Sequence, residues 1–114
     1  MTNEFHNYQT CIDACLKCAT LCNQCATHCT WEENVQQMTR CIRLTRECAA
    51  LCNTAAQLMS LESSRAKDIC FLCAQICEEC ADECSKYDNE YCQECAEACK
   101  MCAQECHALA AVTA

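Results

Sequence analysis

The chain contains no glycine and no proline among its 114 residues. Tight turns and β-hairpins depend on glycine for positive backbone φ angles and on proline for a fixed one, whereas either residue destabilises the interior of a helix. The two absences therefore argue against a β-rich or loop-rich fold. We expect an all-α protein with short connections between its helices.

The sequence also lacks an excess of basic residues and a long apolar run. The formal net charge at pH 7 is −8, which argues against the basic surface of a nucleic-acid-binding domain. Charged or amide side chains interrupt every hydrophobic stretch, so none is long enough to span a bilayer. The first residues, MTNEFHNY, have neither the basic nor the apolar segment of a secretory signal. We expect a cytoplasmic protein with reduced thiols and no nucleic-acid or membrane partner.

Cysteine is abundant instead, with nineteen residues in the chain. The cysteines recur at steps of three and four residues, as in Cys11, Cys15, Cys18 and Cys22. Such residues share one face of a helix, and the alternation is the a/d heptad pattern of helix bundles, where leucine is usual. Thiols along one regular helix are poorly oriented for disulfide bonds, and an odd number leaves one unpaired. The sequence therefore predicts a core lined with free thiols.

Four cysteine-bearing segments are separated by short polar stretches. Residues 1–114 are predicted to form one domain, a single up-down-up-down antiparallel four-helix bundle with a cysteine-lined core and helices at about residues 5–29, 31–59, 64–85 and 89–110. Thr30 and Glu33 have the spacing of a capping box, which predicts that the second helix begins near Trp31. The inward seam of this helix is predicted to be Met38, Cys41, Thr45, Cys48, Cys52, Ala55 and Met59.

Metal binding explains so many in-phase thiols better than core packing does, because leucine or alanine would fill a core without oxidisable groups. The candidate ligands are all the cysteines: Cys11, Cys15, Cys18, Cys22, Cys25, Cys29, Cys41, Cys48, Cys52, Cys70, Cys73, Cys77, Cys80, Cys84, Cys92, Cys95, Cys99, Cys102 and Cys106. Four secondary candidates are Met38 and Met59, which lie in phase on the seam, and His28 and His107, which flank cysteines.

Ligand softness and charge favour Cu(I) as the metal. Cysteines at i and i+4 have Cβ atoms about 5–6 Å apart, so two thiolates can turn toward one Cu(I) ion between them. With about one Cu(I) per shared thiolate, each added charge replaces one lost proton and the buried core stays neutral. Zinc prefers four ligands gathered from separate turns, and the C-x-x-C-x-x-C run of iron–sulfur sites does not occur here.

C-x-x-x-C pairs recur within four helical segments free of glycine and proline, namely Cys11/Cys15, Cys18/Cys22, Cys25/Cys29, Cys48/Cys52, Cys73/Cys77, Cys80/Cys84, Cys95/Cys99 and Cys102/Cys106. In these features the whole chain resembles the bacterial copper storage proteins, specifically their cytosolic branch. The resemblance implies a bundle that folds before metal arrives, binds many Cu(I) ions per chain, assembles as a homotetramer, and stores or sequesters copper.

Two other functions stay open at this point. The first is a zinc- or cadmium-sequestering protein, analogous to a metallothionein but built on a bundle. The second is a thiol redox buffer that holds no metal. We do not expect an enzyme, because the sequence presents no Ser/His/Asp set, no phosphate-binding loop and no recognisable acid-base pair.

Overall fold

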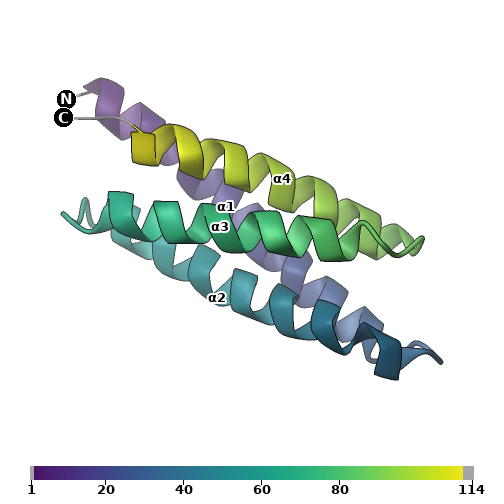
Figure 1. Cartoon of the computed structure of the whole chain (residues 1–114). Coiled ribbons are helices and arrows are strands. Elements are labelled where there is room, and N and C mark those ends of the chain that lie inside the picture. The colour runs from purple at the N-terminus through teal and green to yellow at the C-terminus, as the bar shows by residue number, and fades with distance from the viewer. Residues whose placement is uncertain (1, 112–114) are drawn as a thin grey trace.

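The computed structural model describes residues 2–111 of the chain, with side chains from Tyr8 to Ala111, and it folds them into four antiparallel α-helices (Figure 1). The helices are α1 (Thr2–Cys29), α2 (Thr39–Ser60), α3 (Ala66–Cys84) and α4 (Glu90–Ala111), and a short 3-10 helix, η1 (Val35–Met38), precedes α2. Each α-helix packs against two others, in the cyclic order α1, α2, α3, α4. This arrangement confirms the predicted all-α four-helix bundle.

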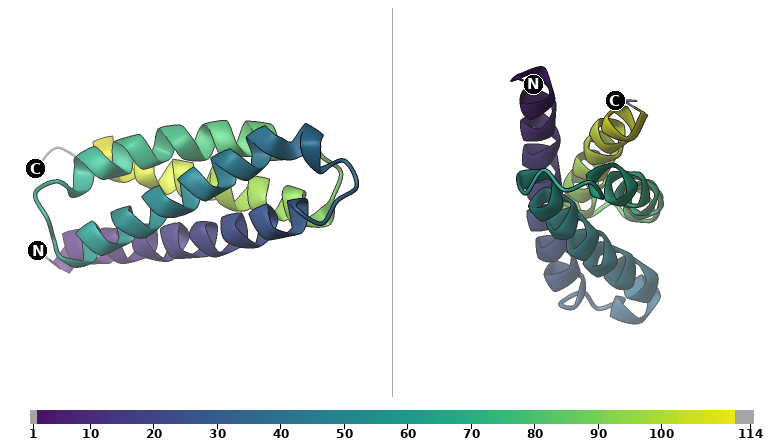
Figure 2. Two further views of the ribbon diagram at one scale, coloured as in Figure 1. Left: turned by 90° about the horizontal axis from the view of Figure 1, so that it is seen from below. Right: turned by 90° about the vertical axis from the view of Figure 1, so that its left-hand side faces the viewer.

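The bundle is long and narrow, with extents of 50 × 18 × 17 Å. Figure 2 shows that the first turn of α1 and the last turn of α4 lie at the same end of the rod. The connection between α2 and α3 closes that end. The connections between α1 and α2 and between α3 and α4 close the opposite end. Residues far apart in the sequence therefore meet in layers stacked along the axis.

The second helix begins later than the sequence predicted. The Thr30 hydroxyl donates a hydrogen bond to the carbonyl oxygen of Thr27 at 2.6 Å, so it closes α1. The chain then turns through η1, and α2 begins at Thr39 with no side chain capping its first N–H groups. The predicted capping box at Thr30 and Glu33 was wrong. The last carbonyl groups of α1 lie next to Thr30, and its hydroxyl donates its hydrogen bond to one of them.

Cysteine side chains make up most of the core. All nineteen cysteines are buried, with exposed fractions of 1% or less. The predicted seam of α2 is confirmed, because Met38, Thr45, Ala55 and Met59 are also exposed by 1% or less. Buried alanines on every helix lie beside the cysteines, and such small side chains let the helix backbones approach closely. The helices are therefore near enough for thiols on different helices to touch.

Larger apolar side chains lie away from the axis. Leu44 and Ile76 are each 7% exposed and pack beside the cysteines. The exposed apolar residues include Leu16, Phe71, Leu72 and Met101. None of the described helices combines the length and the apolar character that crossing a membrane requires.

Candidate metal centre

The thiols form one continuous array along the bundle axis, which we call the sulfur column: the Sγ atoms of all nineteen cysteines, each a free thiol. Between helices, the Sγ of Cys18 lies 3.7 Å from that of Cys99, and the Sγ of Cys22 lies 3.6 Å from that of Cys95. Within a helix, i and i+4 thiols such as those of Cys18 and Cys22 are 3.9 Å apart. These distances are van der Waals contacts, well beyond a disulfide bond of about 2.05 Å.

The column contains groups of four thiols, which we call tetrads, whose Sγ atoms all lie within 4.8 Å of one another. Five of them are Cys15/Cys52/Cys73/Cys102, Cys18/Cys48/Cys52/Cys77, Cys18/Cys22/Cys48/Cys99, Cys22/Cys80/Cys95/Cys99 and Cys25/Cys29/Cys41/Cys92. The first four form a chain in which Cys52, then Cys18 with Cys48, then Cys22 with Cys99, belong to two consecutive tetrads. The arrangement therefore suits metal ions that share bridging thiolates.

Each helix supplies thiols to several levels of the column. The tetrad of Cys25, Cys29, Cys41 and Cys92 draws on α1, α2 and α4 and lies at the end closed by η1. At the opposite end, the Sγ of Cys11 lies 3.7 Å from that of Cys106. The structure thus brings together all the cysteines that the sequence singled out.

The two methionines predicted as secondary ligands lie in the core. Met38, at the end of η1, is fully buried, and Met59, in the last turn of α2, is 1% exposed. Because α2 runs the length of the bundle, their thioethers lie toward opposite ends of the sulfur column. Their placement fits both a core methionine and a soft ligand at the end of the column.

The two histidines lie on the surface. The His28 ring stacks on Tyr91 with centroids 5.0 Å apart and meets the Trp31 ring edge-on at 5.1 Å. On α4, His107 Nε2 lies 2.9 Å from the Oε1 atom of Glu78 on α3. Both side chains are exposed. The described contacts of the histidines are therefore with aromatic rings and a carboxylate.

Hydrogen bonds between neighbouring thiols shift their pKa values in opposite directions. The pKa of Cys22 is raised, first because its thiol interacts with Cys18 and also through burial. The pKa of Cys18 is lowered, because the Cys102 and Cys22 thiols stabilise its thiolate. For Cys29, burial and then the nearby Cys41 raise the pKa to about 11. A metal ion must displace the protons of these thiols, so metal affinity should fall as the pH drops.

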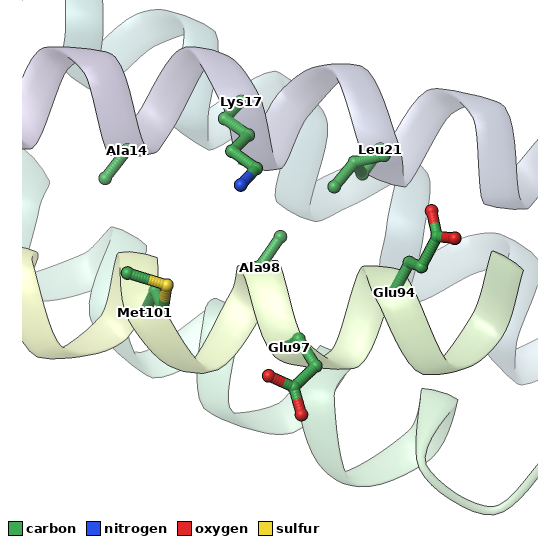
Figure 3. Close-up of a pocket in the computed structure, with 7 residues that line it drawn as sticks. All are labelled: Ala14, Lys17, Leu21, Glu94, Glu97, Ala98 and Met101. Atoms are coloured by element: carbon green, nitrogen blue, oxygen red, sulfur yellow. The ribbon is translucent and has the colours of Figure 1, made fainter. Parts of the chain in front are cut away.

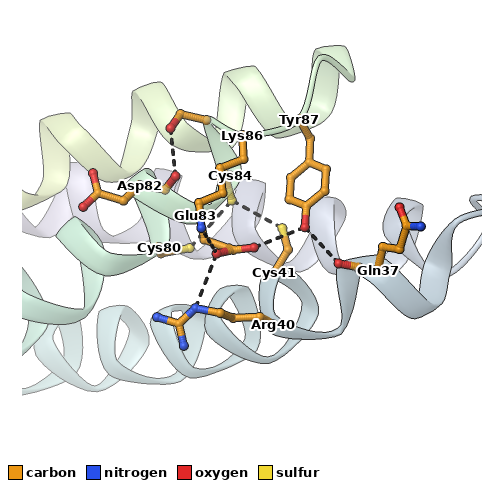
Figure 4. A network of polar contacts seen from close by, with 10 residues as sticks. Gln37, Arg40, Cys41, Cys80, Asp82, Glu83, Cys84, Lys86 and Tyr87 are labelled. Carbon is orange, nitrogen blue, oxygen red and sulfur yellow. Dashed lines mark hydrogen bonds and ion pairs between the residues drawn. The ribbon is translucent and has the colours of Figure 1, made fainter.

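One buried charged residue escaped the sequence prediction. Glu83 on α3 is only 5% exposed, and its carboxylate lies among Arg40, Lys86 and Tyr87 beside the thiols of Cys41 and Cys84 (Figure 4). A signal for its burial does exist in the sequence. Ile69, Ile76 and Glu83 follow one another at intervals of seven residues, and both isoleucines pack in or against the core.

A groove of about 400 Å³ lies outside the column, between α1 and α4 (Figure 3). Ala14, Leu21, Ala98 and Met101 contribute apolar surface to it, and Lys17, Glu94 and Glu97 contribute charges. No cysteine lines this groove, so it is separate from the thiol chemistry.

Comparison with known proteins identifies the family of this chain. The copper storage protein family, Csp, matches residues 4–111. YhjQ, an uncharacterized cysteine-rich protein of Bacillus subtilis (strain 168), is 47% identical over 83 residues, which make up 73% of this chain and 77% of YhjQ.

Two solved structures share the fold over nearly the whole chain. The Cu(I)-bound copper storage protein BsCsp3, from Bacillus subtilis, is 46% identical with a TM-score of 0.89, over 92% of this chain and 99% of that one. A cytosolic copper storage protein from Streptomyces lividans, described with five coppers, is 33% identical with a TM-score of 0.95, over the full length of both chains. The family match and these similarities together show that the chain belongs to the copper storage protein family.

Proposed function

We propose that this chain stores copper by binding several Cu(I) ions along its sulfur column through cysteine thiolates. The observation that carries the proposal is the sharing of cysteines between consecutive tetrads. Sharing lets one thiolate bridge two ions, so that about one Cu(I) per thiolate leaves the buried column without net charge. A column of unshared thiolates would hold uncompensated charge in a region that water does not reach.

All nineteen cysteines are the proposed ligands, since each is buried and belongs to the continuous array. Met38 and Met59 stay predicted soft ligands at the two ends of the column. His28 and His107 stay predicted secondary ligands, and any role of theirs concerns copper outside the column, because both side chains are exposed.

Zinc or cadmium storage is the alternative closest in chemistry, because four thiols within 4.8 Å of one another also suit a tetrahedral divalent ion. A divalent ion bound by four unshared thiolates leaves two negative charges in the core, which disfavours filling the column this way. A redox buffer would need thiols that pair readily, whereas thiols at i and i+4 along one regular helix are poorly oriented for a disulfide bond.

The proposal extends to the setting of the protein. We place it in the cytoplasm, in keeping with the cytosolic relative from Streptomyces lividans, and we assign it no catalytic activity. We further propose a homo-oligomer, a tetramer by family resemblance, in which the exposed side chains of Leu16, Phe71, Leu72 and Met101 contribute to the contacts between copies.

The test is an anaerobic competition between Cu(I) and Zn²⁺ for the reduced apoprotein, with free thiols counted before and after loading. We expect Cu(I) to load at roughly one ion per thiol and to displace Zn²⁺. Loading of one metal per four thiols with zinc preferred would reject copper in favour of zinc storage. Thiols lost to reversible disulfide formation, with neither metal retained, would support the redox buffer.

A further inference from the structure

Glu83 is a buried carboxylate outside the proposed ligand set, and three polar side chains contact it. Its Oε1 atom lies 3.4 Å from Arg40 Nε and 3.1 Å from Lys86 Nζ. Its Oε2 atom accepts a hydrogen bond from the Tyr87 hydroxyl at 3.2 Å, and that hydroxyl also lies 3.0 Å from the carbonyl oxygen of Gln37 (Figure 4). A buried carboxylate is costly unless it is paired, and here Arg40 in α2 and two residues just after α3, Lys86 and Tyr87, supply the pairing.

These partners gather at the start of α2, which has little to stabilise it locally. No side chain caps the first N–H groups of α2, and its first turn contains no acidic residue. A negative charge near a helix N-terminus is favourable, because the helix dipole is positive there. Arg40 lies in this first turn and Gln37 lies in η1 just before it. Glu83 therefore brings from α3 the negative charge that the start of α2 lacks.

The ion pair between Arg40 and Glu83 lies next to a pair of thiols. Arg40 and Glu83 each precede a cysteine, and the Sγ atoms of those cysteines, Cys41 and Cys84, lie 3.7 Å apart. Successive helix residues point in directions about 100° apart. The charged pair and the thiol pair therefore join α2 to α3 at the same level, one near the surface and the other in the core.

Cys41 is a ligand whose position depends on the start of α2. It is the one member of the tetrad of Cys25, Cys29, Cys41 and Cys92 that comes from α2. It lies in the first turn of that helix, and terminal helical turns fray unless they are held. The next seam position, Thr45, carries no thiol that could replace it.

We propose that Glu83 is a positioning residue for copper at this tetrad. It holds the first turn of α2 against α3, and so keeps the Cys41 thiol in contact range of the α1 and α4 thiols. The role in copper binding rests on the proposed function, whereas the positioning of Cys41 can be tested on the apoprotein alone.

The first test measures alkylation rates of single cysteines in the native apoprotein by mass spectrometry, comparing Glu83→Gln with Glu79→Gln, an exposed position on the same helix. Loss of charge-assisted hydrogen bonds is expected to speed alkylation of Cys41 and Cys84 about tenfold, while Cys52 and Cys73 keep their wild-type rates. Arg40→Gln, which leaves Glu83 paired with Lys86 and Tyr87, should give a smaller rise at Cys41. Unchanged rates at Cys41, or an equal rise at all four cysteines, would overturn the proposal.

The second test loads the same variants with Cu(I) and withdraws the metal with a competing Cu(I) chelator. We expect Glu83→Gln to bind the wild-type number of ions at excess copper but to release a minor fraction of them at about tenfold lower chelator concentration. A release curve that matches that of Glu79→Gln would overturn the role in copper binding. If the wild-type protein fails to bind Cu(I), the proposed function fails instead, and the alkylation result still decides whether Glu83 positions Cys41.

Discussion

The Sγ atom of Cys52 on α2 lies 3.6 Å from the Sγ atom of Cys73 on α3. Cys52 also contacts Cys77 on α3 and Cys102 on α4, each at 3.8 Å. Its thiol therefore connects three helices and belongs to two tetrads. A thiolate at this position can bridge two metal ions, so replacing Cys52 is an informative test of the column.

Cys52→Ala is expected to reduce the bound copper by more than one ion per chain, because it removes a ligand common to two tetrads. The lost sulfur also leaves a small cavity, which should cost about 1 kcal/mol in the free energy of unfolding. Anaerobic Cu(I) titration and urea unfolding of the apoprotein measure the two effects.

Thr45→Ala is the matched control for that variant, because Thr45 is fully buried on the same helix and carries no sulfur. It should lower stability by a similar amount and leave the copper number unchanged. An equal loss of copper in both variants would mean that the number depends on core stability and not on the Cys52 thiol.

Thr45 also offers a gain of function. It occupies a seam position where its hydroxyl donates to the carbonyl oxygens of Cys41 and Ile42 at 2.8 and 2.9 Å. Thr45→Cys should add a thiol to the column and raise the Cu(I) capacity by about one ion per chain. The measurement is the same titration, with thiols counted in parallel.

Thr54→Cys provides the comparison, because Thr54 donates to a carbonyl oxygen four residues earlier on the same helix, that of Ala50, but is exposed. Its added thiol should not raise the number of ions that resist a competing chelator. If the two variants gain copper equally, position in the column does not matter and the account of a buried store is wrong.

The stability of the apoprotein should fall in alkaline solution. Burial and the nearby Cys41 raise the pKa of Cys29 from 9.0 to about 11. The folded state therefore holds its proton more tightly than the unfolded chain does. The resulting stabilisation is complete below pH 9 and is lost as the pH rises through about 11.

Copper should remove this pH dependence, since bound thiolates have already lost their protons. Urea unfolding followed by circular dichroism, at about pH 8 and about pH 10.5, compares the apo and Cu(I)-loaded forms. Groups other than the thiols are common to both forms, so the difference between the two forms isolates the thiols. Equal losses of stability in the two forms would contradict thiolate binding.

Much of the column could be predicted from the sequence, because a/d spacing fixes which side chains face the axis wherever a helix is regular. Met59 illustrates this rule, since it was placed on the seam of the second helix and is buried; Met38 is buried as well, although it lies in η1 just before α2. The rule says nothing about where a helix begins. The Thr30 hydroxyl can either cap a helix that follows it or bond to the end of the helix before it, and only the three-dimensional structure shows that it does the second.

The ion pair of Glu83 with Arg40 could not be predicted, because Arg40 lies on another helix, although Lys86 and Tyr87 follow Glu83 closely in the sequence. Arg40 and Tyr87 are distant from each other in the sequence, and neither has a pattern that points to a carboxylate on α3. The heptad position of Glu83 indicated burial, but a charged residue at such a position is usually at the surface. Its pairing depends on the way η1 and the connection after α3 meet at one end of the bundle.

The most direct test is a crystal structure of the Cu(I)-loaded protein, with copper located by its anomalous scattering. We predict several copper ions on the bundle axis, each bound by cysteine Sγ atoms, with thiolates such as that of Cys52 bridging neighbouring ions. Copper bound only to surface groups such as His28 and His107, with the axis empty or its cysteines joined as disulfides, would contradict the account.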